Sequence, residues 1–172
     1  YDVVIPNAFD PDMFVPVPPN KKENYFLYIG RLNDDKGVGI AIDITKRLGI
    51  PLKIAGQGNP DRFLKGQPHV EYLGPLGVDA RKEVMAKARC GVVATHYVEP
   101  FGGTAVEIQM SGTPVISTDW GVFPETVLHG VTGYRCRTLE QFVWAAKNID
   151  KINPHACREW AINNFSLDRV AL

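Results

Sequence analysis

Residues 25–48 read YFLYIGRLNDDKGVGIAIDITKRL: an apolar run, a short charged loop bounded by glycines, and a segment with helical periodicity. The run from Tyr25 to Ile29 is short and apolar throughout, which favours a strand buried on both faces of a sheet. Apolar residues spaced three and four apart from Val38 to Leu48 predict an amphipathic helix. These residues therefore make up the first strand and helix of a strand–helix–strand unit.

The same alternation continues along the chain. Further strands are predicted over 52–55, 70–73, 91–94 and 114–117, and helices over 79–89, 104–111, 139–149 and about 155–163. Parallel strands need a crossover connection such as a helix, and repeated units of this length build a parallel sheet covered by helices on both faces. The predicted fold class is α/β, Rossmann-like.

Composition agrees with one globular domain of this class. The 172 residues are 45% hydrophobic and 22% charged, and a chain of this length buries enough surface to fold without disulfides or a structural metal. The three cysteines have no paired spacing, and no histidine, cysteine or acid cluster has the spacing of metal ligands. Its 19 basic residues balance 19 acidic ones, which argues against the broad basic surface of a nucleic-acid binder. We therefore expect no metal, no cofactor and no nucleic-acid partner.

The first twenty residues differ from the rest of the chain because they hold five of its 13 prolines. Proline fixes φ and lacks an N–H donor, so this density predicts an extended linker over 1–20 and a folded domain over 21–172. The chain does not begin with Met, and we expect it to be a fragment of a longer protein.

Ligands of a doubly wound sheet collect beyond the carboxyl ends of the strands, so the loops that follow the apolar runs are the candidate site. The first of these loops, GRLNDDKG, places Arg31 directly after a strand and Lys36 five residues later. An arginine fork and a lysine point charge together suit a diphosphate. The alternative is that both bases pair with Asp34 and Asp35 on a solvated turn.

A second loop, YVEPFGGTAVE over 97–107, runs from a strand end into a helix that we expect to begin near Gly102. Free N–H groups at Gly103 and Thr104 would then bind phosphate with help from the helix dipole. Glu107 could accept hydrogen bonds from a vicinal diol such as a ribose, and Glu99 from hydroxyls beyond the phosphate. Taken singly, Glu107 is better explained as an acid that stabilises the first turns of its helix, and Glu99 as a solvated loop acid.

The motifs GRLNDDKG, IAGQG, HVEYLG, EPFGGTAVE, SGTPVISTDWG and HGVTGY occur in this order. Together they resemble the C-terminal, donor-binding domain of the retaining glycosyltransferase family 4 (group 1), one half of the GT-B fold. The match covers most of the chain, and the stretch VIPNAFDPDMF resembles the interdomain connector of that family. The resemblance implies that an N-terminal acceptor domain is absent from this chain.

The resemblance also assigns roles. Arg31 and Lys36 match the pair that neutralises the donor diphosphate, and Glu99 matches the first glutamate of the family motif, which contacts the donor sugar; these three are the predicted catalytic residues. The predicted donor-binding residues match glycines, backbone and a ribose-binding acid of the family: Gly30, Gly56, Leu73, Phe101, Gly102, Gly103, Thr104 and Glu107.

The implied reaction is retaining transfer of a hexosyl-type group from a nucleotide-sugar, with UDP or GDP as nucleotide, to a hydroxyl of a sugar or lipid-linked acceptor. The isolated domain is then expected to be inactive or weakly active. A cytoplasmic location is implied, with any peripheral membrane contact made through the missing domain. Two alternatives stay open: another GT-B activity, such as a phosphorylase or sugar-nucleotide epimerase, and a non-catalytic nucleotide-sugar-binding module.

Two further residues have two interpretations each. Trp120 begins the stretch Trp120-Gly121-Val122, where the family more commonly has x-Gly-Gly, and it either packs against its own domain or lines a sugar or acceptor face. His96, three residues before Glu99, is either a base or a simply packed or exposed side chain.

Overall fold

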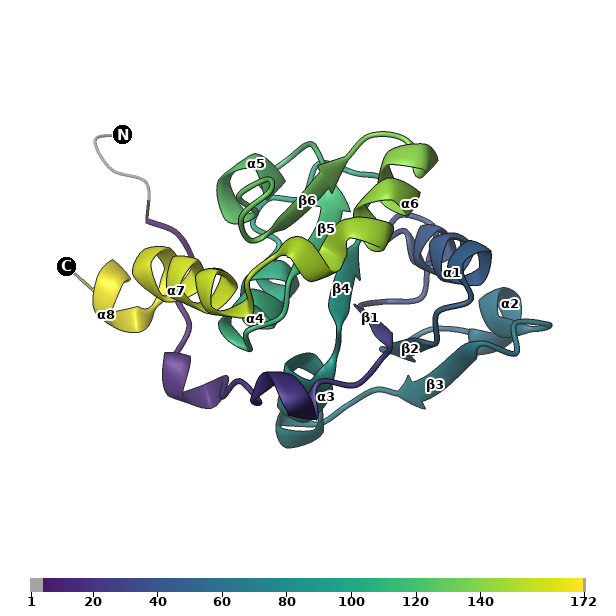
Figure 1. The fold of residues 1–172 in the computed structure, drawn as a ribbon, viewed down its shortest axis with the longest axis horizontal. Helices are drawn as coiled ribbons and strands as arrows, with labels where there is room; N and C mark the ends of the chain where they lie inside the picture. The colour runs from purple at the N-terminus through teal and green to yellow at the C-terminus, as the bar shows by residue number, and fades with distance from the viewer. Residues whose placement is uncertain (1–4, 172) are drawn as a thin grey trace.

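Six parallel strands form one sheet in the order β3-β2-β1-β4-β5-β6 (Figure 1). The structure is a computed structural model and describes residues 5–171. The strands are β1 Phe26–Ile29, β2 Leu52–Ala55, β3 Val70–Gly74, β4 Cys90–Val93, β5 Val115–Thr118 and β6 Gly133–Cys136. The chain runs outward from β1 to β3, returns to β4 beside β1, and then continues to β6, so the strand order reverses between β1 and β4.

Helices cover both faces of this sheet, which confirms the predicted α/β fold class. The main ones are α1 Val38–Leu48, α3 Val78–Lys87, α4 Gly103–Met110, α6 Leu139–Asn148 and α7 Pro154–Phe165. Shorter elements are α2 Pro60–Leu64, α5 Phe123–Thr126, α8 Leu167–Val170, and the 3-10 helices Pro11–Met13, Pro19–Lys21 and Ile149–Lys151. Helices α1 and α6 lie side by side over one face, and α4 packs on α7 over the other (Figure 1).

The packing of strand β1 explains why its sequence is apolar at every position. Phe26 and Tyr28 belong to the core beneath α1 and α6, whereas Tyr25 and Leu27 belong to the core beneath α3, α4 and α7. Alternate residues of a strand point to opposite faces, so a strand covered on both sides must be apolar at every position. The predicted strand and helix at Leu52–Ala55 and Val38–Leu48 are confirmed at the same bounds.

Strand β6 was not predicted, and neither were α2 and α5. The sequence of β6 is GYRC, and only Tyr134 and Cys136 join the core beneath α6. Arg135, between these two residues, is half-buried and its guanidinium pairs with Asp119. The second face of β6 is therefore not part of the apolar core, so this edge strand, which pairs only with β5 among the described strands, lacks the continuous apolar run of a strand buried on both faces. The helices α2 and α5 have five and four residues, too few for a periodicity to appear.

Gly37, the N-cap of α1, joins two loops at the carboxyl edge of the sheet. Its φ is +71°, and a Cβ there would lie 1.8 Å from the carbonyl oxygen of Ala94, directly after β4. Only glycine permits this conformation together with so close an approach. The backbone N–H of His96 also donates to the carbonyl of Asp35, at 2.8 Å. The loops after β1 and β4 are therefore held against each other.

The proline-rich segment packs on the domain. Phe9 exchanges backbone hydrogen bonds of 2.9 Å with Phe165 and Leu167, and Phe14 is buried in the core beneath α4 and α7. The guanidinium of Arg158, on α7, donates to the carbonyl oxygens of Pro11, Phe14 and Met110. Its assignment as an interdomain linker over 1–20 stays a prediction, and residues 1–4 of it lie outside the described residues.

Candidate functional site

A crevice of about 80 Å³ opens at the point where the strand order reverses. Its walls come from the ends of β1 and β4, the two loops that follow them, and the start of α4; they include Gly30, Lys36, Thr95, Glu99, Gly102, Gly103 and Thr104. In open α/β sheets the carboxyl edge at such a switch point is where ligands bind. The structure thus gathers six of the predicted site residues around one crevice.

The charged centre of the crevice is a cluster of Lys36, Tyr97 and Glu99. The Nζ of Lys36 lies 2.8 Å from Oε2 of Glu99, the hydroxyl of Tyr97 donates to the same Oε2 at 2.6 Å, and Lys36 also donates to that hydroxyl. The side chains of Lys36 and Glu99 are only 22% and 13% exposed. Burial lowers the pKa of Lys36, but its hydrogen bonds to Glu99 and Tyr97 outweigh burial and raise the pKa above its ordinary value. Lys36 is therefore a cation at neutral pH.

Tyr97 was not among the predicted residues. Burial first, and then its hydrogen bond to Glu99, raise the pKa of Tyr97, so its hydroxyl keeps the proton that it donates. The available signal was a tyrosine two residues before an acid in a loop after a buried strand, which is too common a pattern to single out.

The start of α4 supplies uncharged donors to the same crevice. The N–H of Ala105 donates to the carbonyl of Gly102 at 2.8 Å, whereas the N–H groups of Gly103 and Thr104 have no acceptor within residues 5–171. Such N–H groups carry the positive end of the helix dipole and favour an anion. Beside the ammonium of Lys36, they make this wall of the crevice suited to phosphate.

Glu107 is held outside the crevice walls. It lies one turn into α4 and accepts a hydrogen bond and ion pair from the guanidinium of Arg81 on α3. The side chains of Glu107 and Arg81 are 18% and 33% exposed. Arg81 was missed by the sequence analysis because the pair spans 26 residues and depends on the packing of α3 against α4.

Four other predicted residues do not line the crevice. Arg31 is exposed, and its carbonyl accepts the Tyr28 hydroxyl at 2.7 Å. The ring of Phe101 stacks on Phe9 with centroids 6.1 Å apart, and Leu73 lies on the edge strand β3. A Cβ on Gly56, whose φ is +145°, would fall 1.8 Å from the carbonyl oxygen of Gly30; this glycine lets the loop after β2 pack against the loop after β1.

The alternative interpretation of the first loop was that its two bases pair with Asp34 and Asp35. Asp34 pairs with Arg62 of α2, and Lys36 pairs with Glu99. Among the residues that the structure describes, neither Arg31 nor Lys36 forms an ion pair with Asp34 or Asp35. Lys36 is therefore turned toward the crevice and not toward its own turn.

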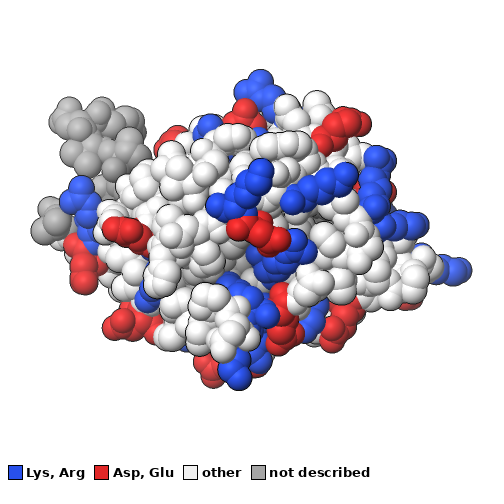
Figure 2. All heavy atoms as spheres, in the orientation of Figure 1, with Lys and Arg blue, Asp and Glu red and all other residues white. Residues whose placement is uncertain are grey.

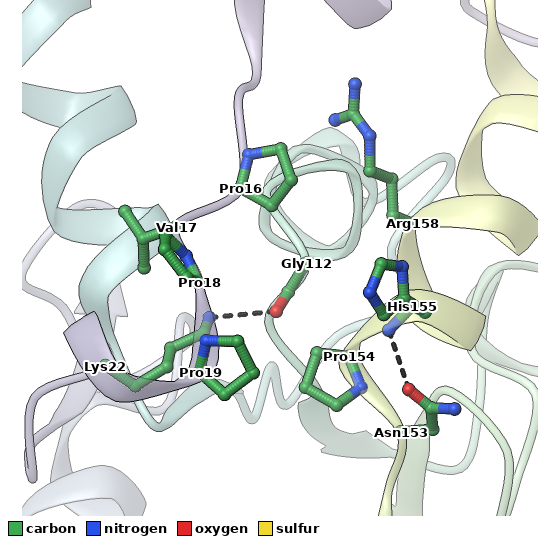
Figure 3. Close-up of a pocket in the computed structure, with 10 residues that line it drawn as sticks. All are labelled: Pro16, Val17, Pro18, Pro19, Lys22, Gly112, Asn153, Pro154, His155 and Arg158. Atoms are coloured by element: carbon green, nitrogen blue, oxygen red, sulfur yellow. Dashed lines mark hydrogen bonds between the residues drawn. The ribbon is translucent and has the colours of Figure 1, made fainter.

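A second cavity, of about 290 Å³, lies between the proline-rich segment and the start of α7 (Figure 3). Its wall includes Lys22 and Arg158. The Nζ of Lys22 donates to the carbonyl of Gly112 at 2.8 Å and to the hydroxyl of Thr113 at 2.5 Å, and Arg158 donates to three carbonyls of the protein. The two cations bond to carbonyl and hydroxyl oxygens of the protein, and these contacts hold the proline-rich segment and the residues that follow it against the domain.

Charge elsewhere is mixed. On the face in Figure 2 acids and bases lie interspersed, with a wide uncharged area beside them. Within residues 5–171 no group of three histidines, cysteines or acids is placed to hold a metal ion. No described helix is long and apolar enough to cross a membrane.

Comparison with known proteins gives a consistent result. Residues 10–157 match the family model of glycosyl transferases group 1. The glycogen synthase of Mycobacterium tuberculosis is 34% identical over 122 residues, which are 64% of this chain and 29% of that protein.

Two crystal structures superpose on nearly the whole chain. AviGT4, a glycosyltransferase involved in avilamycin A biosynthesis, gives a TM-score of 0.84 at 22% identity over 98% of this chain and 54% of that one. HepE of Anabaena, in complex with UDP-glucose, gives a TM-score of 0.82 at 20% identity over 98% of this chain and 54% of that one. The chain thus spans about half the length of these structures and under a third of the synthase.

Proposed function

The chain belongs to the group 1 glycosyl transferases, and from this premise we propose that it is the donor-binding half of a GT-B enzyme that transfers a glycosyl group from a nucleotide-sugar to an acceptor hydroxyl. The observation that carries the proposal is the joint presence, around one crevice, of the Lys36 ammonium and the free N–H groups of Gly103 and Thr104. A cation and a helix N-terminus facing one space are the donors that a diphosphate needs.

In the proposed reaction the bond between the anomeric carbon and the phosphate oxygen breaks, and its electron pair leaves with the nucleoside diphosphate. The acceptor oxygen bonds to the same carbon and passes its proton to the departing diphosphate, with the anomeric configuration retained. Lys36 and the α4 amides stabilise the charge that develops on the diphosphate, which is electrostatic catalysis by preorganised donors. Glu99 contacts the donor sugar, and Arg31, on the exposed rim, attracts the diphosphate.

The remaining assignments follow the same proposal. Glu107 accepts the ribose hydroxyls, the acceptor domain is an N-terminal domain absent from this chain, and transfer by these residues alone is weak or nil. HepE was solved with UDP-glucose, which supports a uridine diphosphate sugar as the first donor to test, with a GDP-sugar as the second. We propose a cytoplasmic location for the reaction, because nucleotide-sugars are its substrates.

Isothermal titration of the chain with UDP, GDP and ADP and their glucose conjugates tests the proposal. Lys36→Met is expected to weaken binding of the preferred diphosphate at least tenfold, because a charged hydrogen-bond donor is worth about 1.5–3 kcal/mol. Lys147→Met, on the exposed face of α6, is the matched control and should leave affinity unchanged. Equal loss in both variants, or no binding of any diphosphate at millimolar concentration, would refute the proposal.

A further inference from the structure

The proline-rich segment lies along α4 from one end of the helix to the other. At the start of α4, a Cβ on Gly103 would lie 3.2 Å from the Cζ of Phe9. Beyond the end of α4, a Cβ on Gly112 would lie 3.0 Å from the Cβ of Pro16 (Figure 3). The segment therefore runs beside α4 in the same direction, and it brings Phe9 to the end of the helix where the free N–H groups lie.

Phe9 is held in place independently of α4. Its N–H donates to the carbonyl of Phe165 and its carbonyl accepts the N–H of Leu167, both at 2.9 Å, so its backbone is tied to the junction of α7 and α8. Its ring stacks on Phe101 with centroids 6.1 Å apart, and the ring of Phe101 meets that of Phe165 edge-on at 5.9 Å. The loop that leads into α4 is thus anchored through Phe101 between two aromatic rings.

The turn at the start of α4 depends on such packing for its conformation. Gly102, the N-cap residue, has a φ of +69°, and no described side chain caps the helix. Two consecutive glycines without a capping side chain leave the backbone conformationally free. A Cβ on Gly102 would lie 2.9 Å from the ring of Phe123, which is 0% exposed, and the neighbouring Gly103 meets Phe9. The direction in which the N–H groups of Gly103 and Thr104 point is therefore set by two aromatic rings.

Of these two rings, Phe123 belongs to the core, whereas Phe9 is half-buried and comes from the proline-rich segment. Phe9 does not line the crevice, so it acts on a ligand only through the turn that it supports. We propose that Phe9 is a positioning residue for the turn of Gly102–Thr104, so that the packing of the proline-rich segment sets the affinity of the crevice for a diphosphate. This inference rests on the proposed function, in which the turn binds the diphosphate of the donor.

Isothermal titration of Phe9→Ala with UDP and with inorganic pyrophosphate tests the proposal. Both ligands should bind about fivefold more weakly than to the wild type, because N–H groups that turn away from a phosphate oxygen lose much of a charge-assisted hydrogen bond. The loss should be equal for the two ligands, since what they share is the diphosphate. Trp144→Ala is the matched control: it removes an aromatic ring that packs edge-on against Tyr134 at 5.1 Å. Neither of these two residues lines the crevice, and both affinities should stay unchanged.

A second pair of variants, Phe9→Leu and Phe9→Met, separates support of the turn from stability. The two introduced side chains have nearly the same volume, but only the unbranched chain of methionine reaches as far as the Cζ that meets Gly103. Both variants should unfold at similar urea concentrations. Affinity for both ligands should fall about threefold in Phe9→Leu and stay close to that of the wild type in Phe9→Met. If Phe9→Ala does not fold, this pair decides the point.

The outcomes distinguish this proposal from the proposed function. Equal affinities of the wild type and Phe9→Ala, or of Phe9→Leu and Phe9→Met, would overturn the positioning role and leave the donor-binding function standing. The same loss in Phe9→Ala and Trp144→Ala would also overturn it. A wild type that binds neither UDP nor pyrophosphate at millimolar concentration would refute the donor-binding function itself, and the positioning role with it.

Discussion

Replacing Glu99 by glutamine is expected to strengthen binding of a nucleoside diphosphate. In this structure the Glu99 carboxylate forms an ion pair with the ammonium of Lys36 at 2.8 Å. A diphosphate that binds to Lys36 must therefore displace this carboxylate. Glutamine keeps a hydrogen-bond acceptor of the same shape but removes the charge. The diphosphate then competes with a neutral amide for the same cation.

The size of the effect follows from the distance and exposure of the pair. Two unit charges 2.8 Å apart attract by about 6 kcal/mol at an effective dielectric constant of about 20, and desolvation of both ions cancels much of this attraction. Exposed pairs are worth about 0.2–1 kcal/mol, and this pair is mostly buried. We therefore take the net cost of displacing the Glu99 carboxylate from Lys36 as about 1.4 kcal/mol. Removing this cost corresponds to a tenfold increase in affinity for the diphosphate.

Isothermal titration with UDP measures the change, and Lys36→Met combined with Glu99→Gln is the control. Without the ammonium the gain should disappear, because there is no cation left for the carboxylate to occupy. UDP-glucose should gain less than UDP, since the proposed contact of Glu99 with the donor sugar is weakened. Unchanged or weaker UDP binding by Glu99→Gln would show that the carboxylate and the diphosphate do not compete for Lys36.

Three further predictions test other parts of the molecule. Glu107→Ala should weaken UDP about tenfold but leave inorganic pyrophosphate unaffected in the same titration, because only UDP has a ribose; equal effects would refute the ribose assignment. Burial lowers the pKa of Lys22 to about 8, so above pH 8 the unfolded chain holds this proton more tightly. The group should then add about 1 kcal/mol to the free energy of unfolding between pH 7 and pH 9. Urea unfolding at the two pH values should show this gain in the wild type and not in Lys22→Met. The buried thiols, whose pKa values burial raises, lower the free energy of unfolding over the same pH range, but they do so equally in both proteins and cancel in the comparison. Gly37→Ala should destabilise the fold by about 2 kcal/mol or more, because φ is +71° and the Cβ would meet a backbone oxygen at 1.8 Å; Gly39→Ala, with nothing within 4 Å of its Cβ, should stabilise α1 by about 0.5–1 kcal/mol.

Much of the fold could be predicted because the central strands are buried on both faces. A continuous apolar run such as Phe26–Ile29 points clearly to a buried strand when helical periodicity follows it at Val38. Strand β6 could not be predicted because it is buried on one face only. The packing of the proline-rich segment could not be predicted because it depends on Arg158, which binds the carbonyl oxygens of that segment. A side chain that bonds to backbone 144 or more residues away leaves no local pattern in the sequence.

The residues of the candidate site also fall into those that could be predicted from the sequence and those that could not. Lys36, Glu99 and the start of α4 could be predicted because they follow strands whose carboxyl ends share one edge. Their partners Tyr97 and Arg81 could not, because a hydrogen bond or ion pair depends on where two loops or helices finally pack.

The pairing of both motif glutamates has a consequence for how this site would recognise its ligand. Glu99 is bonded to Lys36 and Glu107 to Arg81, so each acid is already satisfied by a base of the same domain. Binding a nucleotide-sugar is then an exchange of partners, in which the net gain is the small difference between two sets of hydrogen bonds. Such an exchange favours selectivity over raw affinity, since a ligand that replaces only one partner leaves a largely buried carboxylate or ammonium unpaired. We therefore expect UDP-glucose to exceed UDP in affinity only while both Glu99 and Lys36 are intact, and a double-mutant cycle over the two residues, measured with each ligand, decides the point.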